Sequence, residues 1–188
     1  MIQIIHPNQF KTIPWKNGKG QTTELAISKD GTLNNFDWRL SIASVVEDGP
    51  FSDFSGYERN LILLEGNGIT LTHDKQPVVL DQPFSRSRFN GASKTIGQLI
   101  DGPIKDFNLM TKQGKYHVLV ESYIDQTQIK MIAKNLCFIY SHQYETVISS
   151  AKGKIAIPCG HLAVIHDESK VDITGKGLIL IQLEELIL

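Results

Sequence analysis

Residues 36–68 read FDWRLSIASVVEDGPFSDFSGYERNLILLEGNG. From residue 36 to residue 43, apolar side chains alternate with polar or small ones, which predicts a strand with one buried face. The apolar face holds Phe36, Trp38, Leu40 and Ile42, and the opposite face holds Asp37, Arg39, Ser41 and Ala43. Turn-forming residues then lead into LILL at 61–64, which is typical of a strand buried on both faces. The stretch therefore predicts two strands joined by a shaped loop.

Five residues of this stretch have the spacing of the first metal-binding motif of the cupins. They are Gly49, Ser55, Tyr57, Leu61 and Gly68. In a metal-binding cupin, the places of Ser55, Tyr57 and Leu61 hold two histidines and a glutamate. Serine, neutral tyrosine and leucine do not bind a divalent transition metal as imidazole and carboxylate do. The frame resembles a cupin, and we expect no metal in it.

Short strand signals, separated by turn signals, continue through the rest of the chain. They cover residues 2–5, 69–73, 78–80, 116–122, 136–140, 144–149, 161–166 and 178–183. The glycine-rich run at 15–20 predicts a hairpin followed by a Thr-rich strand. Residues 124–135 are expected to form at best one short helix. Many short strands with regular turns indicate an all-β barrel or sandwich.

Composition excludes several classes of protein. The chain has 188 residues, of which 41% are hydrophobic and 21% charged, as in ordinary soluble globular proteins. A formal net charge of −1 gives no reason to expect a nucleic-acid or anionic membrane partner. Two cysteines make no disulfide framework and fit a reducing compartment. No signal peptide or membrane-length apolar run is evident, so a cytoplasmic location is expected.

The second half of the chain carries a further cupin-like pattern. Residues 153–167 read GKIAIPCGHLAVIHD. In the second cupin motif, a proline and a glycine precede a ligand histidine, and Ala163 stands at the place of that histidine. Two such frames in opposite halves, both without metal ligands, predict two joined jelly-roll barrels. We place an N-terminal half at 1–113 and a degenerate C-terminal half at 114–188, with exchange of strands between them allowed.

Longer blocks carry a more specific resemblance. They are PWKNGKGQTTEL at 14–25, WRLSIASV at 38–45, DGPFSDFSGYER at 48–59, LEGNGITL at 64–71 and DFNLM at 106–110. In this order they resemble the HutD/Ves family of RmlC-like bicupins over most of the chain, although the C-terminal half matches more weakly. Lys19 departs from the pattern, because the family usually has a third consecutive glycine there.

The resemblance implies a double-barrel cupin fold and a homodimer. It also implies a gene that lies beside histidine-degradation genes or is linked to stress responses in some bacteria. The function it implies is regulatory: the protein would bind a small carboxylate of the histidine pathway, such as formylglutamate, and limit flux. No cofactor is expected.

The residues of these blocks are consistent with a pocket for a small anion. Arg39 and Ser41 share one face of a predicted strand, and Arg59 begins the next strand beyond the loop that carries Tyr57. If that face lines the barrel, a guanidinium can bind a carboxylate through two hydrogen bonds, with the Ser41 and Tyr57 hydroxyls completing the set. The remaining candidates are Trp15 as an apolar wall, Asn17 and Thr22 as donors and acceptors, and Asp106 and Asn108, which alternate onto one face.

Two alternatives remain open at this point. Arg39 could be neutralised by an internal carboxylate such as Asp106 and brace the barrel without binding anything. The protein could also be a metal-independent enzyme acting on a small carboxylate or sugar-like substrate, in which case Tyr57 and Asp106 would be the acid and base.

Metal-capable residues also gather near the C-terminal motif. They are Cys159, His161, His166 and Asp167. His161 and His166 are five residues apart, so in a straight strand they face opposite sides. We therefore expect core or edge roles for these residues and no zinc site.

Overall fold

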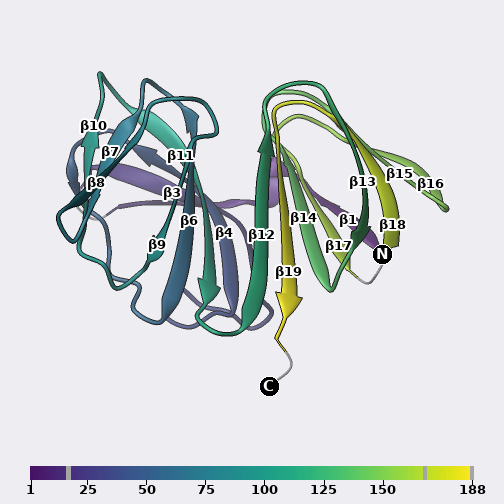
Figure 1. The fold of residues 1–188 in the computed structure, drawn as a ribbon, viewed down its shortest axis with the longest axis horizontal. Coiled ribbons are helices and arrows are strands. Elements are labelled where there is room, and N and C mark those ends of the chain that lie inside the picture. Colours follow the sequence, from purple (N-terminus) through teal and green to yellow (C-terminus); the bar gives the residue numbers. More distant parts are fainter. Residues whose placement is uncertain (16–17, 167–168, 187–188) are drawn as a thin grey trace. The chain divides into compact units, whose positions relative to one another are not determined.

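The structure is a computed structural model that describes residues 1–15, 18–166 and 169–186. Its regular elements are strands, apart from one short 3-10 helix at Pro7–Gln9, so the fold is all-β (Figure 1). The chain divides into two compact units. We call Phe10–Gln113 the N-unit, and Met1–Gln9 together with Gly114–Leu188 the C-unit.

Two sheets form the N-unit. The larger has the strand order β2-β3-β4-β11-β6-β9 and the smaller the order β5-β10-β7-β8. The larger comprises β2 (Lys11–Pro14), β3 (Gly20–Ile27), β4 (Trp38–Val45), β11 (Ile104–Lys112), β6 (Tyr57–Glu65) and β9 (Arg86–Asn90). The smaller comprises β5 (Gly49–Pro50), β10 (Thr95–Leu99), β7 (Ile69–His73) and β8 (Gln76–Leu80). All pairings are antiparallel.

The C-unit repeats this two-sheet plan. One sheet has the order β1-β17-β14-β19-β12 and the other β13-β18-β15-β16. The first comprises β1 (Ile2–Ile5), β17 (Leu162–His166), β14 (Leu136–Ser141), β19 (Leu178–Glu185) and β12 (Tyr116–Tyr123). The second comprises β13 (Thr127–Ala133), β18 (Ser169–Gly175), β15 (Thr146–Ser150) and β16 (Gly153–Ile157).

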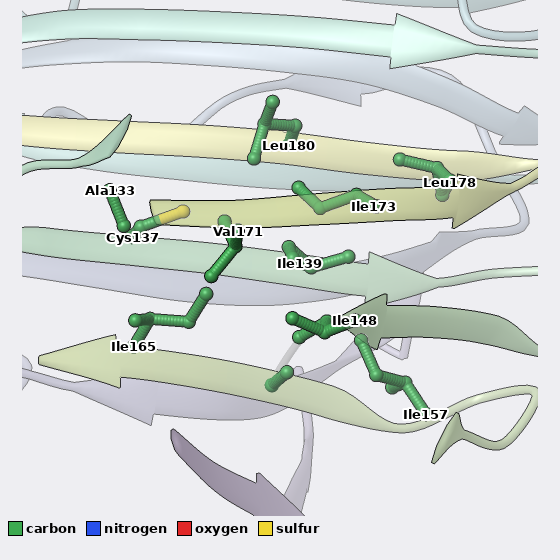
Figure 2. Packing of buried hydrophobic residues seen from close by; sticks show 11 residues of the cluster. Ala133, Cys137, Ile139, Ile148, Ile157, Ile165, Val171, Ile173, Leu178 and Leu180 are labelled. Carbon is green, nitrogen blue, oxygen red and sulfur yellow. The ribbon is translucent and has the colours of Figure 1, made fainter. Parts of the chain in front are cut away.

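The interior of the C-unit is filled by aliphatic side chains. Figure 2 shows this cluster, in which Ile139, Ile148, Ile173 and Leu178 are all fully buried. Ala163, which stands at the ligand place of the second cupin motif, also belongs to the cluster. The interior of this unit is therefore a packed core, whose cohesion comes from the removal of apolar surface from water.

The strands predicted in the second half at 116–122, 136–140, 144–149, 161–166 and 178–183 are confirmed as β12, β14, β15, β17 and β19. The short helix at 124–135 is wrong. Strand β13 occupies this segment instead, because Ile129 and Met131 alternate toward the C-unit core while Lys130 is exposed.

Residues 1–9, assigned to the N-terminal half from sequence, lie in the C-unit, because β1 pairs with β17. The boundary at Gly114 coincides with the point where the chain passes from the N-unit into the C-unit. Across the described residues, no helix has the length and apolar character to cross a membrane.

We predict that Ile173→Ala lowers the free energy of unfolding by about 2–5 kcal/mol, because it opens a cavity among fully buried side chains. Urea unfolding followed by circular dichroism measures the change. Ile132→Ala on neighbouring β13 is the matched control, since Ile132 is 49% exposed, and it should cost well under ~1 kcal/mol. Equal losses would contradict the assignment of the core.

Candidate functional site: a cavity in the N-unit

A cavity of about 510 Å³ lies within the N-unit. One wall is the inner face of β4, from which Arg39, Ser41, Ala43 and Val45 project. The opening stretch of sequence predicted a strand with Arg39 and Ser41 on one face, and it is this face that lines the cavity. Because the two residues occupy alternate positions on one strand, their side chains point the same way.

Antiparallel register extends this wall across three neighbouring strands. Arg39 of β4 lies opposite Met110 of β11, and Met110 lies opposite Arg59 of β6. The next row along the strands holds Glu24, Ser41, Asn108 and Leu61. Two arginines thus project from strands separated only by β11, about 10 Å apart at the backbone.

Arg39 is paired within the protein. Its Nε donates to Glu24 Oε2 at 2.7 Å, and the two side chains are 6% and 18% exposed. An internal carboxylate such as Asp106 was one of the two alternatives left open for Arg39 from sequence, and the partner in the structure is Glu24. Glu24 fills this role because the β3–β4 register sets it beside the strand that carries Arg39.

Arg59 is also buried, but its neighbours differ from those of Arg39. It is 4% exposed, and its guanidinium carbon lies 5.2, 5.7 and 5.1 Å from the ring centroids of Phe51, Phe54 and Phe89. Its Nη2 donates to Asn108 Oδ1 at 2.8 Å, whereas its Nε is buried with no hydrogen-bond partner in the described part of the chain. The aromatic faces partly compensate the positive charge of Arg59. The Nε–H group of the guanidinium remains without a hydrogen-bond acceptor among the described residues.

Asp106 precedes Asn108 by two residues on β11 and does not line the cavity. It is fully buried, and its Oδ1 accepts a hydrogen bond from Asn108 Nδ2. Both polar atoms of the Asn108 amide are therefore used within the protein. Arg59, Asn108 and Asp106 form a chain of hydrogen bonds that fixes the guanidinium in place.

The two charged ends of this chain titrate differently from free side chains. Burial lowers the pKa of Arg59 to about 10, against the opposing effect of Asp106, so Arg59 remains charged at neutral pH. Burial raises the pKa of Asp106 to about 7, against the effects of the Arg59 charge and of the Asn108 hydrogen bond. Near pH 7 Asp106 is therefore only partly ionised, and Arg59 is not fully neutralised.

Trp15 and Thr22 also line the cavity. The indole Nε1 of Trp15 donates to the Thr22 hydroxyl at 2.8 Å, so the polar atom of the indole is used internally. Thr22 thus positions the apolar wall that was predicted at Trp15. Asn17 lies outside the described residues.

Tyr57 does not line the cavity. Its hydroxyl accepts a hydrogen bond from the Phe36 backbone N–H at 3.1 Å, and its ring stacks on Phe36 at 4.2 Å. In the β6–β11 register, Tyr57 is also six positions from the residue opposite Asp106, or roughly 20 Å. The structure therefore does not bring Tyr57 and Asp106 together as an acid and base.

Several cavity residues were not found from sequence. They include Leu33, Phe51, Phe54 and Met110, and Glu24, which pairs with the lining residue Arg39, was also missed. Glu24 and Met110 share the alternating faces of Thr22 and Asn108, so the period of two could have indicated them. Leu33, Phe51 and Phe54 come from loops, where no period predicts the direction of a side chain.

The residues at the metal-ligand positions of the first cupin motif make other contacts in this structure. Ser55 donates from its backbone and its hydroxyl to Asp53, and Leu61 is fully buried in the N-unit core. Across the described ranges, no group of three or more His, Cys, Asp or Glu side chains is placed to hold a metal ion.

A family model described as HutD matches residues 7–181. The chain belongs to the HutD family. It is 38% identical over 120 residues to an uncharacterised 21.2 kDa protein in the hutC 3′ region of Pseudomonas putida, covering 64% of this chain and 63% of that protein. It is 40% identical over 102 residues to protein Ves of Escherichia fergusonii, covering 52% and 51%. The chain thus spans less than two thirds of the length of these relatives.

Solved structures extend the likeness to the whole chain. A conserved protein of unknown function from Pseudomonas aeruginosa PAO1 superposes with a TM-score of 0.89 at 26% identity, over 98% of this chain and 99% of that one. HutD from Pseudomonas fluorescens SBW25, in a formate condition, gives 0.84 at 29% identity over both full lengths. A cupin 2 conserved barrel protein from Leptotrichia buccalis gives 0.56 at 11% identity over 93% and 96% of the two chains. The fold of this HutD-family chain is therefore cupin-like.

We predict that Asp106→Asn changes how stability depends on pH. Between pH 4 and 7 the folded chain keeps the Asp106 proton that the unfolded chain releases, so the stability of the unaltered protein falls as pH rises through this window. The amide of the variant carries no such proton. The unfolding free energy of the variant relative to the unaltered protein should therefore rise between pH 5 and pH 8, by on the order of a few kcal/mol. Urea unfolding at several pH values measures it, and parallel profiles would contradict the raised pKa.

Proposed function

We propose that the N-unit cavity binds a small carboxylate and that the protein acts as a metal-free, regulatory binding protein. The observation that carries this proposal is the state of Arg59. Its guanidinium is buried, charged at neutral pH and held in place by Asn108, a neutral partner. A buried charge without a full counter-charge is costly, and an anion in the cavity would relieve that cost.

The lining residues favour binding over catalysis. Among the described residues, the titratable groups at the cavity surface are Lys19, Arg39, Glu47 and Arg59. Glu47 lies 3.5 Å from Lys19, and both side chains are substantially exposed. Within the described part of the chain, the lining supplies no histidine, cysteine or tyrosine, which are common general acids and bases.

The family supplies a context for this ligand. A relative of this chain is named for its place in the hutC 3′ region, and the HutD family is associated with histidine utilisation. A carboxylate of that pathway, such as formylglutamate, is therefore a natural first candidate. Binding without conversion would suit a protein that senses or limits the level of a metabolite.

We predict that small carboxylates stabilise the protein through Arg59. At about 100 times its Kd, a ligand adds roughly 2.7 kcal/mol, which raises the Tm of a chain of this size by about 5–11 °C. A thermal-shift panel of formate, acetate, glutamate and formylglutamate, each beside its neutral amide or ester, measures the effect. Arg59→Met should abolish the rise.

Arg88→Met is the control, because Arg88 lies on the adjacent strand β9 with 62% of its side chain exposed. That variant should keep the full rise in Tm. If Arg59→Met fails to fold, Arg59→Lys retains the charge without the planar fork and should weaken binding about tenfold. An undiminished rise in an Arg59 variant would place the site elsewhere. Mass spectrometry of the ligand recovered after incubation with the protein separates binding from turnover. An unchanged mass indicates binding alone, whereas a changed mass would favour an enzyme.

A further inference from the structure

We propose that Asp106, a residue outside the cavity lining, takes up a proton when a carboxylate binds at Arg59, so that the cavity binds its anion together with a proton. This inference rests on the proposed function and adds regulation by pH to the same site. Asp106 touches no ligand in this scheme. It acts through the guanidinium that it helps to position.

A single side chain connects Asp106 to the cavity. Asn108 donates from Nδ2 to Asp106 Oδ1, and its own Oδ1 accepts from Arg59 Nη2 at 2.8 Å. Asn108 and Arg59 line the cavity, whereas Asp106 does not. The charges of Asp106 and Arg59 act on each other across this amide. A carboxylate that binds Arg59 from the cavity therefore competes with Asp106 for one positive charge.

The surroundings of Asp106 make its ionised form costly. The side chain is fully buried, and its neighbours across the sheet, Ala43 on β4 and Leu63 on β6, are apolar. Its Oδ2 has no hydrogen-bond partner in the part of the chain that the structure describes. A buried carboxylate is held in its charged form largely by an opposite charge nearby, which here is Arg59. Neutralising Arg59 with a ligand withdraws that support and favours the protonated form.

The titration of these groups sets the direction of the pH dependence. Burial raises the pKa of Asp106 to about 7, so at pH 7.5 the empty site holds Asp106 mostly ionised and able to accept a proton. Arg59, with a pKa of about 10, and a small carboxylic acid both stay charged between pH 6 and 8. Because the protonated form of Asp106 no longer competes for Arg59, affinity for the carboxylate falls as pH rises through 7.

Charged side chains on the strands around Asp106 form ion pairs with one another. They are Arg39 with Glu24 at 2.7 Å, Lys105 with Glu65 at 2.9 Å, and Arg88 with Glu58 at 2.6 Å. Each pair balances its own charge, so none of them replaces Asp106 as the group that responds to an anion at Arg59.

His73 on β7 is the alternative proton acceptor, because it also senses the charge of Arg59. Burial and that charge lower its pKa from the ordinary value, against the effect of Asp74. Its ring nitrogens lie 2.9 Å from the Thr95 hydroxyl and 3.0 Å from the Ser87 hydroxyl. An anion at Arg59 would raise the pKa of His73 as well, so the test must separate the two groups.

Isothermal titration calorimetry on the full chain tests the inference, with acetate and formylglutamate as probes. Titrations at pH 7.5 in Tris and in bis-tris propane, which differ in heat of ionisation, give the number of protons taken up. We expect an uptake of about 0.5 proton or more per bound carboxylate, and binding roughly fivefold weaker at pH 8 than at pH 6. Binding without proton uptake would overturn the inference.

Two variants locate the proton. Asp106→Asn should show no uptake, keep the same affinity from pH 6 to 8, and bind roughly fivefold more tightly than the unaltered protein at pH 8, because its amide carries no charge. A purely structural residue would instead weaken binding when altered. His73→Gln is the matched control and should keep both the uptake and the pH profile. Uptake lost in His73→Gln and retained in Asp106→Asn would assign the proton to His73 and overturn the inference.

The outcomes also separate this inference from the function on which it rests. If Asp106→Asn does not fold, the uptake by the unaltered protein and by His73→Gln still decides the question. If a probe binds through Arg59 with no proton taken up, the inference is overturned and the proposed carboxylate site stands. If neither probe binds, or both bind undiminished to Arg59→Met, the proposed site itself fails, and the inference with it.

Discussion

The burial of one charge, that of the Arg59 guanidinium, constrains much of the N-unit. Removing an arginine from water costs several kcal/mol unless nearby groups compensate. Here compensation comes from three phenylalanine faces and from the hydrogen-bonded chain through Asn108 to Asp106. These groups belong to β6, β9, β11 and the loop before β6, so all four must be in place together. Gly97 belongs to the same arrangement, since a Cβ there would come within 2.7 Å of the Phe51 ring.

The two units put the same two-sheet plan to different uses. In the C-unit, aliphatic side chains fill the interior (Figure 2). In the N-unit, a similar apolar cluster that includes Leu61, Leu63 and Leu71 occupies part of the interior, while polar rows and a cavity occupy the rest. Packing in the C-unit supplies stability, and the N-unit can accommodate buried polar groups because its own cluster is retained beside them.

The lumen of the N-unit also differs in chemistry from a metal-binding cupin. Leu61 stands where such a cupin has a glutamate, and it belongs to the core. Two residues earlier on the same strand face is Arg59, which brings a positive charge into the lumen. A lumen lined by carboxylate and imidazole attracts a cation, whereas one with a surplus guanidinium attracts an anion. The cupin frame is therefore kept while the charge of the side chains in its lumen differs.

Local patterns in the sequence determined the strand content, the cupin-like frame, the loss of its metal ligands and the polar face of β4, because each depends on residues close together in the chain. Six of the nine predicted ligand residues line the cavity: Trp15, Thr22, Arg39, Ser41, Arg59 and Asn108. Only the tertiary structure decided that Glu24 neutralises Arg39, that Tyr57 bonds Phe36, and that Phe51 and Phe54 flank Arg59. The pairing of β1 with β17 was likewise beyond the sequence. These groups come together through the register between strands and the conformation of the loops. The alternation of side chains along a single strand does not specify either of these.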